Sequence, residues 1–313
     1  MRRKVIKHGP ASHVISLPSD WVKKYGIIKG SELDVITEED NIIIRSSTES
    51  PSEETKIDIT GLDRTSIMYI LRSLYRLGYD LVDVRFDETK TTYQRKNKEV
   101  NVISVIHKEI DRLIGYEIID EKERSCKIKD LQTINFKEFD QVLRRIFLLL
   151  KSMSEEFLNA TKEENNASFE TFDAKHDTIT KFVSYCLRIL NKKGYIEPKK
   201  TSYYYHIIAL LDRITDIIKY AARNAMELDK KFDKKSIDLL SLIHESITKY
   251  YELFYKYENK DIHKINNIRY TAEKMLKDIS KNISEIEIII LADMFQICEI
   301  LLDLIEARTA LEY

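Results

Sequence analysis

Residues 207–225 read IIALLDRITDIIKYAARNA, and this stretch decides the fold class of the chain. Its apolar residues recur at intervals of three and four, which is the spacing of one face of an α-helix. A helix with one continuous apolar stripe buries that stripe against neighbouring elements. The stretch therefore predicts one member of a helical bundle, whose stripe consists of Ile207, Leu211, Ile214, Ile218, Ala221 and Ala225.

The helical period extends over the whole C-terminal region, and strand signals vanish after residue 135. Breaks at Gly194 and Pro198 separate two of the helices. Six helices are predicted, and their approximate ranges are 135–162, 167–193, 201–229, 233–258, 261–281 and 284–311.

Acidic residues recur in the two halves of this region. The pair Asp212 and Asp216 is followed 87 residues later by an acidic pair on the sixth helix, Glu299 and Asp303. Asp173 on the second helix is followed 88 residues later by an aspartate on the fifth. These nearly equal offsets indicate a duplicated three-helix unit.

The first 46 residues have a different pattern, with short strands and tight turns. Strands are predicted at Val14–Pro18, Leu33–Thr37 and Ile42–Arg45, and one or two helical turns at Asp20–Tyr25. A segment this short cannot bury an adequate core without disulfides, metals or a partner. Because it contains no cysteine, we expect an obligate dimer.

A polar stretch, Ser46–Thr55, is the predicted linker to a mixed middle segment. The middle segment is predicted to be a β-α-β-α-β-β unit. Its elements are a strand around residues 57–59, a helix from Asp63 or Thr65 to Leu77, a strand at Tyr79–Phe86, a helix at Glu99–Leu113, and a hairpin of Tyr116–Asp120 with Ser125–Ile128. The sequence thus predicts three domains, with boundaries at 1–50, 55–131 and 135–313.

Charge is distributed unevenly along the chain, although the net charge is −1. Residues 1–30 carry seven Lys and Arg against one acid, whereas residues 31–60 carry nine acids against two basic residues. Such a basic N-terminus suits a polyanionic partner. The three cysteines are far apart, which is typical of reduced thiols in a cytoplasmic protein. No apolar run is long enough for membrane insertion, and no catalytic sequence motif is present, so an enzyme is not expected.

The segment Lys4–Pro18, followed by Trp21-Val22 and Lys29–Leu33, resembles the AbrB/SpoVT family of swapped-hairpin DNA-binding domains. One departure is Ser19-Asp20, where the family usually offers a lysine. The resemblance implies a homodimer formed through residues 1–46 that binds double-stranded DNA. The candidate DNA-binding residues are Arg2, Arg3, Lys4, Lys7, His8, Lys23 and Lys24. A basic tail that only dimerises is the alternative; the antitoxin use of this fold is disfavoured because no toxin-wrapping tail is visible.

Three runs in the C-terminal region resemble the PhoU family: Leu211–Ile217, Cys298–Asp303 and Asp173–Asp177. Carboxylates four residues apart share one helix face, and two like charges there favour a bound cation. The face opposite the apolar stripe is predicted to meet solvent. The resemblance implies an iron, zinc or magnesium site made by Asp173, Asp177, Asp212 and Asp216.

A second, degenerate site would use Asp261, Glu299 and Asp303, with Ile265 in place of an expected acid. The alternative for both sites is an ordinary solvated acidic helix face.

The middle segment, including Leu113–Ile118, resembles the connector of archaeal PhoU-like regulators. The combined resemblance implies a transcriptional regulator that represses phosphate uptake. Its bundle would sense phosphate status through metal or through a phosphate transporter's ATPase subunit. The alternative is an adaptor that docks on the transporter and uses its N-terminal domain for dimerisation alone. A metal-dependent hydrolase is the third hypothesis.

Overall fold

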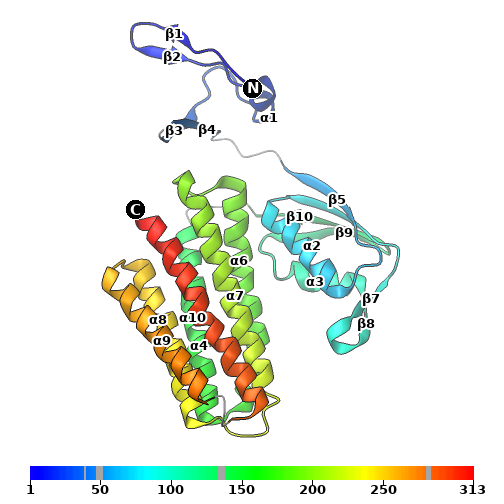
Figure 1. The fold of residues 1–313 in the computed structure, drawn as a ribbon. Coiled ribbons are helices and arrows are strands. Elements are labelled where there is room, and N and C mark those ends of the chain that lie inside the picture. The colour runs from blue at the N-terminus through cyan, green and yellow to red at the C-terminus, as the bar shows by residue number, and fades with distance from the viewer. Residues whose placement is uncertain (39, 47–51, 133–137, 280–282) are drawn as a thin grey trace. The chain divides into compact units, whose positions relative to one another are not determined.

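The computed structural model describes residues 1–313 except 39, 47–51, 133–137 and 280–282 (Figure 1). The chain divides into two compact units, Met1–Glu54 and Thr55–Tyr313. The predicted linker and the predicted boundary between residues 131 and 135 fall partly outside the described residues.

The N-terminal unit consists of two hairpins and one short helix. Strand β1 (Ile6–His8) pairs antiparallel with β2 (Ser12–Val14). Helix α1 (Ser19–Lys24) follows, and β3 (Leu33–Glu38) then pairs antiparallel with β4 (Asn41–Ser46). The second hairpin and the short helix lie where the sequence predicts them. The predicted strand Val14–Pro18 is wrong in extent, because the β1–β2 pairing ends at Val14.

No described side chain in the N-terminal unit is buried. Several of its apolar residues are instead exposed, including Val5 at 64%, Val35 at 61% and Ile42 at 66%. A folded domain normally buries such residues, because burial of apolar surface is the main driving force of folding. The unit therefore lacks a core of its own.

The second unit begins with an α/β layer that we call the connector (residues 55–131). Its sheet has the strand order β5-β6-β10-β9. The strands are β5 (Glu54–Asp58), β6 (Leu81–Arg85), β9 (Tyr116–Lys122) and β10 (Ser125–Asp130), and the helices are α2 (Arg64–Leu77) and α3 (Val102–Ile110).

Local capping fixes the ends of helix α2, as the sequence predicts. The Asp63 carboxylate accepts hydrogen bonds from the backbone N–H groups of Thr65 and Ser66, at 2.7 and 2.9 Å. Gly78 ends the helix with a φ of 109°, which favours glycine. The Ile67 and Leu71 side chains on the inner face belong to the connector core.

A second hairpin in the connector was missed by the sequence reasoning. Strand β7 (Lys90–Tyr93) and strand β8 (Lys98–Asn101) flank a 3-10 turn, η1 (Gln94–Lys96). These strands are polar and lack the apolar alternation on which strand prediction depends. The helix predicted from Glu99 consequently begins later, at Val102, where the Asn101 side chain caps its first turn.

The C-terminal region contains, among its described residues, six helices longer than 20 residues. Their bounds are α4 (Phe139–Glu163), α6 (Phe172–Lys193), α7 (Thr201–Ala225), α8 (Lys234–Tyr255), α9 (Asn259–Ile279) and α10 (Glu285–Glu312). A short helix, α5 (Asn166–Phe169), precedes α6, so the second predicted helix is interrupted near Glu170. The start predicted for the first helix, at residue 135, lies outside the described residues.

The bundle helices pack as two similar triplets. In the first triplet α4, α6 and α7 all contact one another, and in the second α8, α9 and α10 do the same. The triplets join where α7 lies along α10 and α4 along α8. All six stripe residues of α7 are buried, as the sequence predicts. No described helix is both long and apolar enough to cross a bilayer.

Arg188 of α6 joins the bundle to the connector. Its side chain is 1% exposed, and its guanidinium donates to Asp80 Oδ1 at 2.9 Å and to Asp130 Oδ2 at 2.6 Å. It also donates to the backbone carbonyl of Tyr75 at 2.7 Å and lies over the rings of Tyr75 and Tyr116. A buried guanidinium with these partners fixes the connector against α6.

Candidate functional site

A polar cleft of about 270 Å³ lies where the connector meets helices α6 and α7. Helices α2 and α3 and the turn η1 form one wall, and α6 and α7 form the other. The four aspartates that predicted a metal site all line this cleft. The sequence predicts that Asp212 and Asp216 face solvent. The structure instead places both in this cleft, where their side chains are only 18% and 33% exposed.

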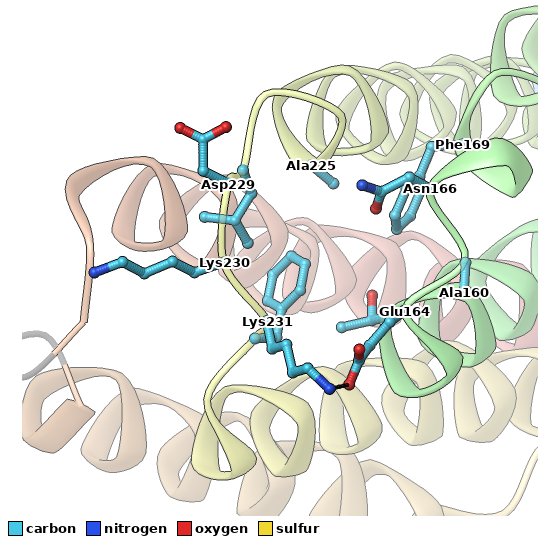
Figure 2. A pocket seen from close by; sticks show the side chains of 11 residues that line it. Ala160, Glu164, Asn166, Phe169, Ala225, Asp229, Lys230 and Lys231 are labelled. Carbon is cyan, nitrogen blue, oxygen red and sulfur yellow. Dashed lines mark ion pairs between the residues drawn. The ribbon is translucent and has the colours of Figure 1, made fainter.

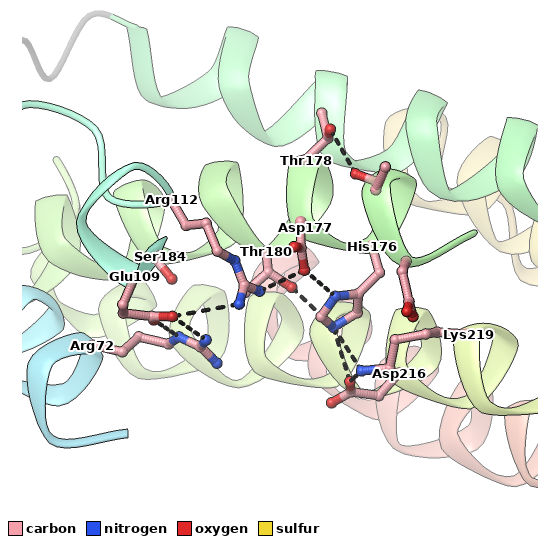
Figure 3. A network of polar contacts seen from close by, with 12 residues as sticks. Arg72, Glu109, Arg112, His176, Asp177, Thr178, Thr180, Ser184, Asp216 and Lys219 are labelled. Atoms are coloured by element: carbon pink, nitrogen blue, oxygen red, sulfur yellow. Dashed lines mark hydrogen bonds and ion pairs between the residues drawn. The ribbon is translucent and has the colours of Figure 1, made fainter. Parts of the chain in front are cut away.

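Two of the aspartates are paired with arginines of the connector. Asp212 lies 3.1 Å from the guanidinium of Arg76 in α2 and accepts a hydrogen bond from Thr180 at 2.9 Å. Asp177 lies 2.8 Å from the guanidinium of Arg112, which follows α3. These ion pairs join the two walls of the cleft, and Figure 3 shows the pair of Arg112 and Asp177.

The other two aspartates are paired within the bundle. Asp216 contacts the Lys219 ammonium and lies 2.9 Å from Nε2 of His176. His176 is nearly buried, and its Nδ1 lies 3.0 Å from Asp177, so the imidazole bridges the two carboxylates (Figure 3). Asp173, which is largely exposed, lies 2.6 Å from Arg223.

The protonation of this group follows from its contacts. Burial by itself lowers the pKa of His176, but hydrogen bonds to Asp177 and Asp216 outweigh it and raise the pKa above its ordinary value. Burial likewise raises the pKa of each carboxyl, but the His176 hydrogen bonds and the nearby cations outweigh it and lower the pKa of Asp177 and Asp216. The imidazolium and both carboxylates therefore stabilise one another in their charged forms.

As arranged in the structure, the four carboxylates are paired with cations. A hard cation needs several oxygen ligands around one point, whereas each of the four aspartates here faces a Lys or Arg instead. Among the described residues no group of three or more His, Cys, Asp or Glu side chains is placed to hold a metal.

Two of the three residues predicted for the second site are likewise paired with cations. Asp261 contacts Lys264 at 2.6 Å, and Glu299 contacts Arg269 at 2.8 Å. Asp303 is exposed on α10.

A smaller pocket of about 200 Å³ lies at the end of the bundle, beside α5 and the α7–α8 loop (Figure 2). Its charged pair, Lys231 and Glu164, is close at 2.6 Å but largely exposed. Exposed pairs of this kind contribute little energy, and the pocket gathers no further set of convergent polar groups.

The predicted DNA-binding residues lie on the surface of the N-terminal unit. All seven are exposed: Arg2, Arg3 and Lys4 precede β1, Lys7 and His8 belong to it, and Lys23 and Lys24 end α1. Across the hairpin, Lys7 pairs with His13 of β2, which the sequence reasoning did not select.

The same hairpin carries apolar side chains on its other face. Ile6 lies opposite Val14, and they are 61% and 42% exposed. In the second hairpin Val35 and Ile42 share one face and are also exposed. Each hairpin therefore offers an apolar face that a partner chain can cover.

Residues 9–52 match the family model for antidote-toxin recognition MazE, bacterial antitoxin. The matched range includes β2, α1 and the β3–β4 hairpin and begins directly after β1. It supports the N-terminal swapped-hairpin DNA-binding domain expected from the sequence. The searches of curated proteins and of solved structures found no match to the chain.

The sequence reasoning selected the acids of the cleft but missed the cations opposite them. Arg64, Arg72 and Arg76 recur on α2 at spacings of eight and four residues, and Lys108 and Arg112 are four apart. That spacing places the three arginines on one face of α2, whereas Arg112 lies just beyond the end of α3. Attention to basic residues at helical spacing, as well as to acids, would have found them.

Proposed function

We propose that this chain is a dimeric DNA-binding transcriptional regulator. The observation that carries the proposal is the match of residues 9–52 to the MazE model, because domains of this type bind DNA and dimerise. The exposed basic residues around β1 supply the charge that phosphate contacts need.

Dimerisation is supported independently by the burial of the N-terminal unit. It has no buried side chain among its described residues, and both hairpins expose apolar faces. Pairing two copies buries those faces and brings two basic strands together, which doubles the charge offered to a duplex.

The regulated process is proposed to be phosphate uptake, with repression as the outcome. Support comes from the PhoU-like runs in the sequence and from the two three-helix sets of the bundle. The proposed routes for the signal are a metal held by the cleft aspartates and contact with the ATPase subunit of a phosphate transporter.

The test is a gel-shift titration of the full chain with DNA from upstream of its own coding sequence, with and without phosphate and divalent metal. We expect a shifted complex whose affinity falls steeply with salt, because phosphate contacts release counterions. Replacing Arg2, Arg3 and Lys4 by Ala removes these three cations from each protomer of the dimer and should flatten the salt slope by about five. Replacement of three basic residues far along the chain (Lys274, Lys277 and Arg269) is the matched control and should leave the slope unchanged.

Two other functions remain to be separated from this one. A transporter adaptor without DNA binding would show no complex even at low salt, while still forming dimers. An antitoxin, as the name of the MazE model suggests, would need a segment that recognises a toxin. Residues 55–313 instead form a compact unit, so the regulator is preferred.

A further inference from the structure

The cleft between the connector and helices α6 and α7 has more cations than its acids can neutralise. Seven Lys and Arg residues line it against four aspartates, which leaves three positive charges in excess before His176 is counted. Such an excess in a concave site attracts anions, because low-dielectric walls focus the field.

The excess can be assigned to particular residues. Arg112, Lys219 and Arg223 pair with aspartates of the cleft, and Arg72 lies 2.7 Å from the buried Glu109 behind it. Within the described part of the chain, no ion pair is recorded for the remaining three lining cations, Arg64, Arg95 and Lys108. They come from α2, η1 and α3, so they approach the cleft from three elements of one wall.

The acids of the opposite wall do not cancel this charge. His176 and Lys219 compensate Asp216, while Arg112 and His176 compensate Asp177. An anion bound against the connector wall would therefore contact the unpaired cations of that wall. The acids of the opposite wall are already neutralised by their own partners (Figure 3).

Aromatic rings lie among these cations. Tyr69, Tyr93 and Tyr220 line the same cleft. The Arg64 guanidinium lies 4.2 Å from the centre of the Tyr93 ring, which holds it in place while leaving its N–H groups able to donate.

We propose that this cleft binds a small anion carrying two or more adjacent phosphate groups. A guanidinium presents its donors in a planar fork that matches phosphate oxygens, and linked phosphates can reach cations on three separate elements at once. The cleft volume suits a small molecule and is too small for a duplex. This site goes beyond the proposed DNA-binding function, since all its residues belong to residues 55–313.

Two sources provide this chemistry: inorganic pyrophosphate and the phosphate chain of a nucleotide. Calorimetric titration of the full chain, without DNA or divalent metal, with pyrophosphate and separately with ATP tests the proposal. Both should bind. Equal affinities mean that the phosphates alone are recognised, and tighter ATP binding means that the base adds contacts with the tyrosines. Because no DNA is present, failure of the DNA-binding function would not affect the result.

The matched variants are Arg95→Ala and Lys96→Ala, neighbours in η1 of which only Arg95 lines the cleft. We expect Arg95→Ala, Arg64→Ala and Lys108→Ala each to weaken pyrophosphate binding by about tenfold, since each removes a charge-assisted hydrogen bond. Lys96→Ala should change it less than about twofold. Thermal unfolding of each variant would confirm that it folds.

Three results would overturn the proposal. One is the absence of binding by either phosphate compound at millimolar concentration. Another is an equal loss of affinity in Lys96→Ala and Arg95→Ala, which would mean diffuse surface attraction. The third is citrate binding as tightly as pyrophosphate, which would mean that the cleft recognises charge without selecting phosphate.

Discussion

The two units of this chain differ in how far they bury their own side chains. Residues 55–313 bury two apolar clusters and even enclose charged side chains such as Arg188 and Glu109. Residues 1–54 bury none of their described side chains and expose isoleucines and valines on both hairpins. A unit that completes its own core can carry buried ion pairs, whereas one that does not must obtain its core from a second chain.

The largest expected effect tests whether the buried ion pairs hold residues 55–313 together. Arg188→Met leaves Asp80 and Asp130 without their buried guanidinium and should lower the free energy of unfolding by about 3–5 kcal/mol. Chemical unfolding followed by circular dichroism measures this. Arg145→Met, at an exposed position on α4, is the control and should cost less than about 1 kcal/mol. A loss of similar size in both variants would contradict the conclusion that the buried ion pairs of Arg188 stabilise residues 55–313.

The next effect tests the dependence of the N-terminal unit on a partner. Introducing charge at its exposed apolar face, as Val35→Asp with Ile42→Asp, should raise the dimer dissociation constant by about a hundredfold, because unpaired charges would be buried between the chains. Sedimentation of the full chain checks it. Tyr270→Asp, at an exposed aromatic of α9, should leave the dimer intact; a wild-type chain that is monomeric at micromolar concentration would refute the comparison.

A smaller effect concerns the ion pairs of the cleft. Asp212→Asn removes the charge that faces the partly buried Arg76 and should cost about 1–2 kcal/mol of unfolding free energy. The exposed acid Asp303 on α10 is the matched position, and Asp303→Asn should cost less than about 0.5 kcal/mol. Equal losses would show that the pairing across the cleft contributes nothing to stability.

The smallest expected effect is a dependence of the bundle's stability on pH. Burial lowers the pKa of His244, whose Nδ1 lies 2.8 Å from Ser154 Oγ across the contact of α4 and α8. The neutral form is therefore favoured by folding, and its contribution is present above the unfolded pKa near 6.5 and is lost as the pH falls below it. His244→Asn should reduce the loss of stability between pH 7 and pH 5.

His176 provides a contrast of opposite sign. Its raised pKa means that its contribution is complete below the unfolded pKa and is lost as the pH rises through the folded pKa. His176→Asn should therefore reduce the loss of stability on the alkaline side. Unfolding free energies of the two variants, measured at pH values on both sides of the unfolded pKa, separate the two contributions. Identical pH profiles for both variants would contradict the pKa shifts given for His176 and His244.

The sequence predicted most of the elements because their signals are local. The stripe of α7, the caps of α2 and the turns of the second hairpin depend on residues a few positions apart. The β7–β8 hairpin was missed because its strands are polar and carry no such signal.

The sequence alone thus determined the helical bundle, the connector's helices and its strands other than β7 and β8, and the basic, coreless N-terminus. Only the tertiary structure decided what the acids of α6 and α7 contact: Arg76 and Asp212 are 136 residues apart, and no periodicity relates residues at that distance. It likewise decided that Arg188 enters the connector and that its neighbours compensate it. Side-chain pairing across a fold depends on which helix faces meet, and that is settled by packing of the whole chain.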